Sequence, residues 1–114
     1  MPFSEHEKAR IARLVEKFGN QRIPPSVREQ IRLQHQVKGD TVTLFETRPP
    51  WRGTGAWSST PIARFRHEAS TGRWSLYWHD GQSRWRPYDR CEEAADLAEL
   101  LAEVDEDPAR VFWG

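Results

Sequence analysis

The sequence predicts one α+β domain spanning residues 1–114, built on a five-stranded antiparallel sheet flanked by an N-terminal and a C-terminal amphipathic helix. Three observations carry this prediction. The length suits a single domain. Apolar residues recur at helical spacing near both ends of the chain, and the segments between alternate or cluster as strands separated by short turns. The expected order is therefore a helix, a β-hairpin, a three-stranded meander and a second helix.

The composition is that of a folded domain, with 37% hydrophobic and 30% charged residues. Six Trp, five Phe and two Tyr supply large buried surfaces to a small core. Cys91 is the single cysteine and closes no internal disulfide, and no Cys or His spacing is typical of a zinc site. No apolar run approaches the length that spans a bilayer. These features predict a cytoplasmic protein without cofactor, metal or membrane contact.

The first helix begins at a capping box, because Glu7 follows Ser4 by three positions. Its apolar stripe consists of Ile11, Leu14, Val15 and Phe18. Gly19-Asn20 is expected to end this helix in a left-handed cap. The break at Ile23-Pro24-Pro25 then leads into a short helical turn over residues 26–29.

A hairpin follows, since residues 31–38 alternate strictly between apolar and polar side chains. Gly39-Asp40 has glycine first, as a type II′ turn requires, and residues 41–48 form the return strand. The predicted cross-strand pairs are Val37–Val42, His35–Leu44, Leu33–Glu46 and Ile31–Arg48. Because this register puts Glu46 and Arg48 on the apolar face, we expect them to form an ion pair at the rim of the core.

The connection over residues 49–60 is too rich in Pro, Gly and Ser for regular structure. It carries Trp51 and Trp57, which belong either to a binding loop or to a plug that seals the end of the sheet. Since a loop tryptophan usually buries its ring, the plug is the favoured interpretation.

The meander consists of three strands, over residues 61–68, 73–79 and 84–88. If both connecting turns hold an even number of residues, the two faces of the meander separate cleanly. One face is then apolar and gathers Ala63, Phe65, Trp74, Leu76, Trp78 and Trp85. The other is polar and basic and gathers Arg64, Arg66, Arg73, Ser75, Tyr77, His79, Arg84, Arg86 and Tyr88.

The last helix is predicted over residues 91–104, where Asp89 with Glu92 resembles a capping box. Its apolar stripe consists of Ala94, Leu97, Ala98, Leu101 and Val104, and its outer face is acidic. Asp107-Pro108 is expected to stop the helix or to start a new segment. The apolar residues 111–113 that follow must dock on the domain.

Four stretches occur in an order that resembles a family of short bacterial proteins: Leu44-Phe45-Glu46-Thr47-Arg48-Pro49, Pro61-Ile62-Ala63-Arg64-Phe65, Trp74-Ser75-Leu76-Tyr77-Trp78 and the ending from Asp107-Pro108 to Phe112-Trp113-Gly114. This family is described as domain of unknown function 3024. The resemblance covers nearly the whole chain. It implies a small bacterial protein and supplies no activity, substrate or catalytic residue.

The formal net charge is zero, but residues 1–90 carry a net +7 and residues 91–114 a net −7. In the even-turn register, Tyr77 lies between Arg64 and Arg86, with Arg66 and Tyr88 beside them. Flat rings between guanidinium groups suit single-stranded nucleic acid, which offers bases for stacking and phosphates for ion pairing. The alternative is a solvated face whose arginines stack on their own tyrosines.

Two other function classes remain open. A small acid–base enzyme would use Glu46, Arg48 and His35, joined by His67, because a carboxylate and an imidazole on one apolar face can exchange protons. The alternative is a rim ion pair beside a half-buried histidine. A protein-binding or regulatory module, including self-association, would use the loop tryptophans, the charge split and a free sheet edge.

Overall fold

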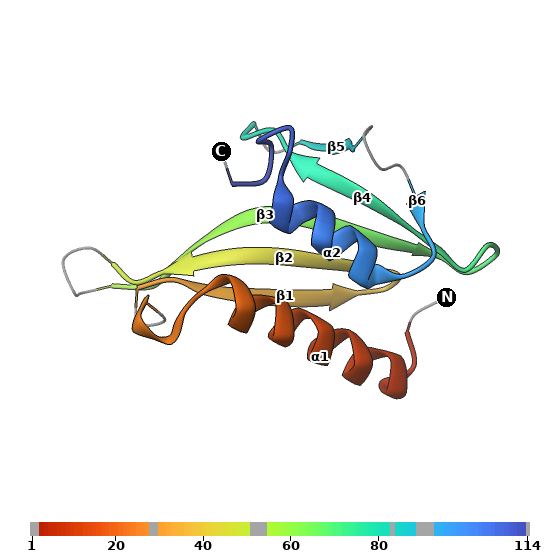
Figure 1. Cartoon of the computed structure of the whole chain (residues 1–114), viewed down its shortest axis with the longest axis horizontal. Coiled ribbons are helices and arrows are strands. Elements are labelled where there is room, and N and C mark those ends of the chain that lie inside the picture. Colours follow the sequence, from red (N-terminus) through yellow and green to blue (C-terminus); the bar gives the residue numbers. More distant parts are fainter. Residues whose placement is uncertain (1–2, 28–29, 51–54, 83, 89–92, 114) are drawn as a thin grey trace.

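The computed structural model describes residues 3–27, 30–50, 55–82, 84–88 and 93–113. Its helical elements are α1 (Glu5–Arg22), a 3-10 turn (Pro25–Val27) and α2 (Leu97–Glu106). Its strands are β1 (Arg32–Lys38), β2 (Thr41–Arg48), β3 (Ser58–Glu68), β4 (Arg73–His79), β5 (Trp85–Pro87) and β6 (Glu93–Ala94). They form one antiparallel sheet in the order β1-β2-β3-β4-β5, with β6 also pairing with β4 (Figure 1). The predicted α+β fold class is confirmed.

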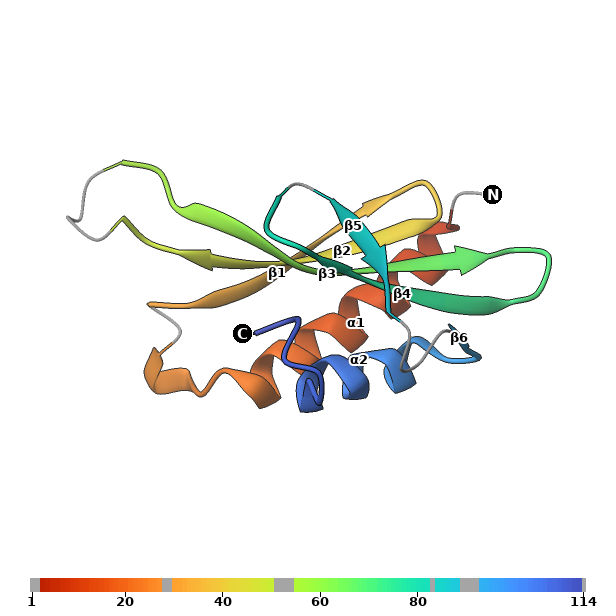
Figure 2. The same ribbon diagram turned by 90° about the horizontal axis from the view of Figure 1, so that it is seen from above.

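Both helices lie on the same side of the sheet, as the view in Figure 2 shows. Helix α1 packs along β1, and α2 packs against β3 and β4. We call the side of the sheet that carries the helices the inner face and the opposite side the outer face. No described helix covers the outer face.

Helix α1 begins at the predicted capping box: the Ser4 hydroxyl accepts from the Glu7 amide at 3.1 Å, and the Glu7 carboxylate accepts from the Ser4 amide at 3.0 Å. The predicted end at Gly19-Asn20 is wrong, because the helix continues to Arg22 and the Ile23 amide still donates to the Gly19 carbonyl. Gly19 instead faces β1, where an added Cβ would lie 3.6 Å from the Leu33 Cβ. This is an ordinary van der Waals distance, so the position has room for a small side chain.

The first hairpin has the predicted pairs Val37–Val42, His35–Leu44 and Leu33–Glu46. Gly39 has a φ of +60° and Asp40 does not have positive φ, as a type II′ turn requires. The ladder ends at Arg32–Thr47, so the expected pairing of Ile31 with Arg48 is not part of it.

Strand β3 begins at Ser58, three residues before its predicted start. A β-bulge makes this extension possible: Leu44 pairs with Ala63 but Phe45 pairs with Pro61, which leaves Ile62 as an extra residue. Pro61 is accommodated at this irregularity, where a ladder hydrogen bond is dispensable.

The turn between β3 and β4 holds an even number of residues, as predicted, and pairs Phe65 with Leu76 and Arg64 with Tyr77. The turn between β4 and β5 does not. His79 pairs with Trp85, so five residues lie between them and the parity of β5 is inverted. Trp85 therefore lies on the outer face, half-exposed, and its predicted place in the core is wrong.

The same inversion turns Tyr88 inward, where its side chain is 3% exposed and its hydroxyl donates to the Glu103 carboxylate at 2.9 Å. The core between the inner face and the helices is centred on fully buried side chains from both layers, namely Val42, Leu44, Phe65, Leu76, Leu100 and Val104. Trp74 is buried as predicted, whereas Trp78 is only half-buried at the border of this core.

The acidic segment near the C-terminus begins as a strand and not as a helix. Ala94 pairs with Trp74 in β6, and α2 begins only at Leu97, six residues later than predicted. The expected capping residues 89 and 92 lie outside the described residues. The helix buries Leu97 and Leu101 as predicted, together with Leu100, while Ala98 is exposed.

The C-terminal segment docks on the domain, as expected, through Asp107. This residue ends α2 in the left-handed region at a φ of 44°. Its carboxylate accepts from the backbone amides of Val111 at 2.8 Å, Trp113 at 2.9 Å and Phe112. The Trp113 indole donates to the Val104 carbonyl at 2.7 Å, and Arg22 lies 3.8 Å over its ring.

Asp107→Asn should lower the free energy of unfolding by about 1–3 kcal/mol, because it removes the charge and one of the two oxygens that satisfy these amides. Asparagine tolerates the left-handed backbone, so the loss does not arise from backbone strain. Urea denaturation of both proteins measures it. The matched control is Glu106→Gln, which removes an exposed charge one residue earlier and should have little effect. Equal stability of the two variants would contradict this account.

Candidate functional site

A shallow hollow of about 410 Å³ opens on the outer face, where β3, β4 and β5 lie side by side next to the β1–β2 turn. Its lining combines two cations, two aromatic rings, a threonine and one carboxylate, namely Arg64, Arg66, Tyr77, Trp85, Thr41 and Asp40. Three of these residues were expected on this face. Trp85 was not, and it arrives here through the inverted parity of β5.

Arg64 is held in a fixed position on this face. Its Nε donates to the Thr43 hydroxyl at 3.2 Å, and its guanidinium lies 4.5 Å from the centre of the Trp85 ring. Both partners are uncharged. In the part of the chain that the structure describes, no carboxylate forms an ion pair with Arg64. Its positive charge is therefore available to an anionic ligand.

Arg66 lies beside it, with its Nε 3.6 Å from the Asp40 carboxylate. The Tyr77 hydroxyl and the Asp40 carboxylate raise the pKa of the Arg66 guanidinium above its usual range. Tyr77 is also the cross-strand partner of Arg64, so its side chain lies near both arginines in the lining of the hollow. The hollow thus offers two cations and two aromatic rings side by side.

Asp80 sets the register that brings Trp85 outward. Its carboxylate accepts from the amides of Gln82 at 2.8 Å and Arg84 at 3.3 Å, and from the Arg86 side chain at 2.9 Å. The Gln82 amide, chiefly, lowers the pKa of this carboxyl. An Asp followed by Gly81, whose φ is +83°, is the sequence signal for such a turn.

The remaining members of the predicted basic face are distributed differently. Arg73 lies on the outer face but is neutralised by Glu93 at 3.1 Å. Arg84 is exposed at the end of the turn. The predicted outward positions of Arg86 and Tyr88 are wrong, because the inverted register pairs Arg86 with Trp78 and buries Tyr88.

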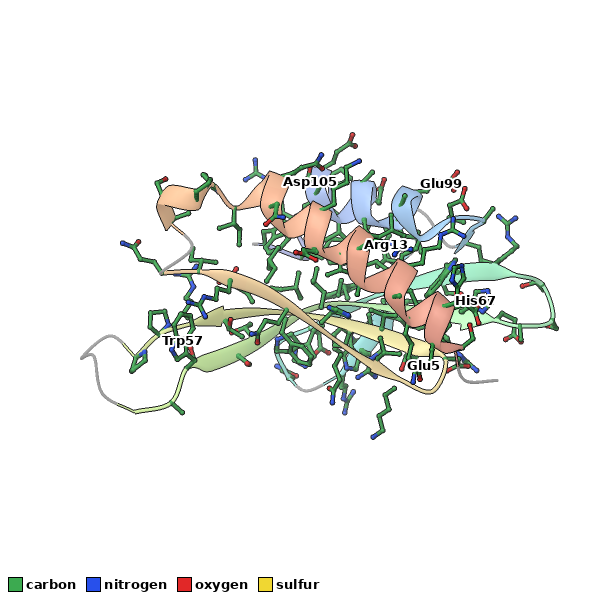
Figure 3. The ribbon with its side chains drawn as sticks, turned by 90° about the horizontal axis from the view of Figure 1, so that it is seen from below. Glu5, Arg13, Trp57, His67, Glu99 and Asp105 are labelled. Atoms are coloured by element: carbon green, nitrogen blue, oxygen red, sulfur yellow. The ribbon has the colours of Figure 1, made fainter. Side chains whose placement is uncertain are left out.

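The expected ion pair between Glu46 and Arg48 is confirmed, with 2.7 Å between Oε1 and Nε. The Glu46 side chain is 18% exposed and that of Arg48 58%, as befits the rim of the core. Trp51 lies outside the described residues. The sealing role predicted for Trp57 is wrong: its ring is 40% exposed, on the side of the sheet opposite the helices (Figure 3).

The histidines of the acid–base hypothesis do not join the Glu46–Arg48 ion pair. His35 is half-buried, and desolvation lowers its pKa. His67 contacts the rings of Phe3 and Trp74, at the opposite end of β3 from the strand segment that pairs with Glu46. Among the described residues, no hydrogen bond or ion pair joins these two histidines to Glu46, and no group of three metal-ligating side chains occurs.

A second hollow, of about 430 Å³, lies on the inner side between α1 and the start of α2. Its floor is apolar and includes Trp74. Three carboxylates, from Glu7, Asp96 and Glu99, and one cation, from Arg10, line it. The two hollows therefore differ in charge, and the outer one is suited to an anion.

Residues 3–114 match the model of a family described as Domain of unknown function (DUF3024). Neither the curated proteins nor the solved structures compared with the chain include a match. None of the described helices has the length and apolar character needed to cross a membrane.

Asp80→Asn should destabilise the protein at neutral pH, since the ionised carboxylate is the form that these donors favour. Because the folded pKa lies below the ordinary value of 3.8, the stabilisation is present above that value and is lost as the pH falls through the folded pKa. Urea denaturation at pH 7 and near pH 3 should therefore show a difference that shrinks in acid.

Glu16→Gln, an exposed substitution on α1 that removes the same charge, is the control and should behave like the wild type at both pH values. A difference between wild type and Asp80→Asn that stays constant or grows on acidification would contradict the role given to Asp80.

Proposed function

Since the chain belongs to the DUF3024 family, which is described only as a domain of unknown function, we propose its function from the geometry: it is a small binding domain that holds single-stranded nucleic acid on the outer face of its sheet. The observation that carries this proposal is Arg64. Its guanidinium is fixed on the Trp85 ring and by Thr43, and no carboxylate of the described residues neutralises it.

The chemistry of the hollow fits a single strand better than a duplex. Base–aromatic stacking requires unpaired bases, and Tyr77 and Trp85 supply two half-exposed rings. Arg64 and Arg66 lie next to these rings, where the phosphates of a stacked strand would run. The Trp85 ring is contacted by the Arg64 guanidinium and by the His79 ring, whose centre lies 5.1 Å away at an interplanar angle of 73°, and a base would stack on the part of the indole that these two leave exposed.

The shape of the domain also favours an extended ligand. The outer face is an open sheet surface, and the hollow on it is shallow and bordered by exposed side chains. The acidic helix α2 lies on the inner side (Figure 2), so its carboxylates do not cover the cations of the outer face. Although the net charge of the chain is zero, the acidic residues of α2 lie on the inner side and Arg64 and Arg66 lie on the outer face.

Arg64→Ala should weaken binding of a single-stranded oligonucleotide and reduce the slope of log K against log[salt] by about 0.7, because one phosphate contact is lost. Trp85→Ala should weaken binding roughly fivefold to a hundredfold, as expected for the loss of one stacked base. Fluorescence anisotropy with a labelled oligo(dT) across a salt series measures both effects.

Arg13→Ala is the matched control, because it removes the same charge from the exposed side of α1 (Figure 3). It should leave the affinity nearly unchanged. Thermal melts of each variant separate loss of binding from loss of folding. If the wild-type protein does not bind at low salt, where electrostatic attraction is greatest, the nucleic-acid proposal fails and the protein-partner alternative takes its place.

A further inference from the structure

We infer that the binding site continues beyond the hollow to Trp57, which with Arg32 forms a second stacking position at the other end of the outer face. The ligand would then be a single strand of about six nucleotides. This inference rests on the proposed function and specifies the length and path of its ligand.

Trp57 is the one large apolar side chain among the described residues that is markedly exposed. The Arg32 guanidinium lies 4.5 Å from the centre of its ring. This is the same separation as between Arg64 and Trp85. In both pairs the arginine occupies one face of an exposed or half-exposed indole. A base can stack on the part of each ring that its arginine leaves exposed.

The register places both pairs on the same side of the sheet. Arg32 pairs with Thr47 across the first hairpin. Thr47 in turn pairs with Ser59, which follows Trp57 by two residues. Arg64 is opposite Thr43. Thr43 and Thr47 are four residues apart on β2, so their side chains point to the same face. Figure 3 likewise shows Trp57 on the side of the sheet away from the helices.

Between the two pairs, the described residues place no charge on the outer face that would repel a phosphate backbone. The residues that the register places on the outer face there are uncharged: Gln34, Gln36, Thr43, Phe45, Thr47, Ser59 and Pro61. Glu46 lies on the inner face, engaged by Arg48. The Asp40 carboxylate lines the hollow with Arg64 and Trp85 and is engaged by Arg66.

The separation of the two pairs predicts the length of the ligand. Arg64 follows Ser58 by six positions along β3, which corresponds to about 20 Å of strand. A stacked single strand rises about 3.4 Å per nucleotide, so about six nucleotides span the distance. Three nucleotides would reach only the hollow.

The test is competition by unlabelled oligo(dT) of two to ten nucleotides against a labelled oligo(dT). The wild-type affinity should rise steeply up to about six to eight nucleotides and then level off. Trp57→Ala should lower the affinity for the octamer roughly fivefold to a hundredfold and leave that for the trimer unchanged. Trp57→Phe, which keeps a ring, should recover most of the octamer affinity.

The outcomes separate the two proposals. If the oligonucleotides bind but Trp57→Ala has the wild-type affinity at every length, the second stacking position is refuted and the hollow alone remains. If Trp57→Ala weakens the trimer as much as the octamer, the two-position path is also refuted. Absence of binding at any length and at low salt would overturn both proposals together.

Discussion

The whole arrangement depends on the packing of two amphipathic helices against one face of a single sheet. The apolar stripes of α1 and α2 require a partner surface, and the inner face supplies it with side chains such as Phe65 and Leu76. Both helices therefore lie in one layer on the inner side of the sheet, and the acidic residues of α2 lie there too. A two-layer domain of this size leaves the other sheet face to solvent. The described helices consequently leave the polar, cationic and aromatic side chains of that face uncovered.

A second constraint is the turn that Asp80 organises. Its carboxylate holds two backbone amides and Arg86, and so it fixes five residues between His79 and Trp85 instead of four. One additional residue exchanges the two faces of the strand that follows. It moves an indole from the expected core to the outer face, and it moves Tyr88 into the core, where the Tyr88 hydroxyl donates a hydrogen bond to the Glu103 carboxylate. The composition of the candidate site is thus decided by a local turn.

Much of the fold could be predicted because its signals are local. The capping box at Ser4, the register of the first hairpin and the rim pair of Glu46 with Arg48 follow from spacing and alternation over a few residues. The start of α2 could not be predicted, because Ala94 pairs with Trp74, some twenty residues earlier, and tertiary pairing overrides helical periodicity. The site was recovered in part. The alternation of β3 and β4 predicts that Arg64, Arg66 and Tyr77 face the same side of the sheet. The side that Trp85 faces depends on the length of the preceding turn, and the exposure of Trp57 depends on which side chains cover it, so neither could be predicted.

The proposed ligand-binding surface is the outer face, which no described helix covers. A ¹H–¹⁵N NMR titration of the full chain with an unlabelled oligo(dT) octamer tests it most directly. The account predicts shifts of the amides of β3 and β4 around Arg64 and Tyr77 and of the indole N–H groups of Trp85 and Trp57. The amides of α1 and α2 should stay in place. Shifts concentrated on the helices, or none at low salt, would contradict it.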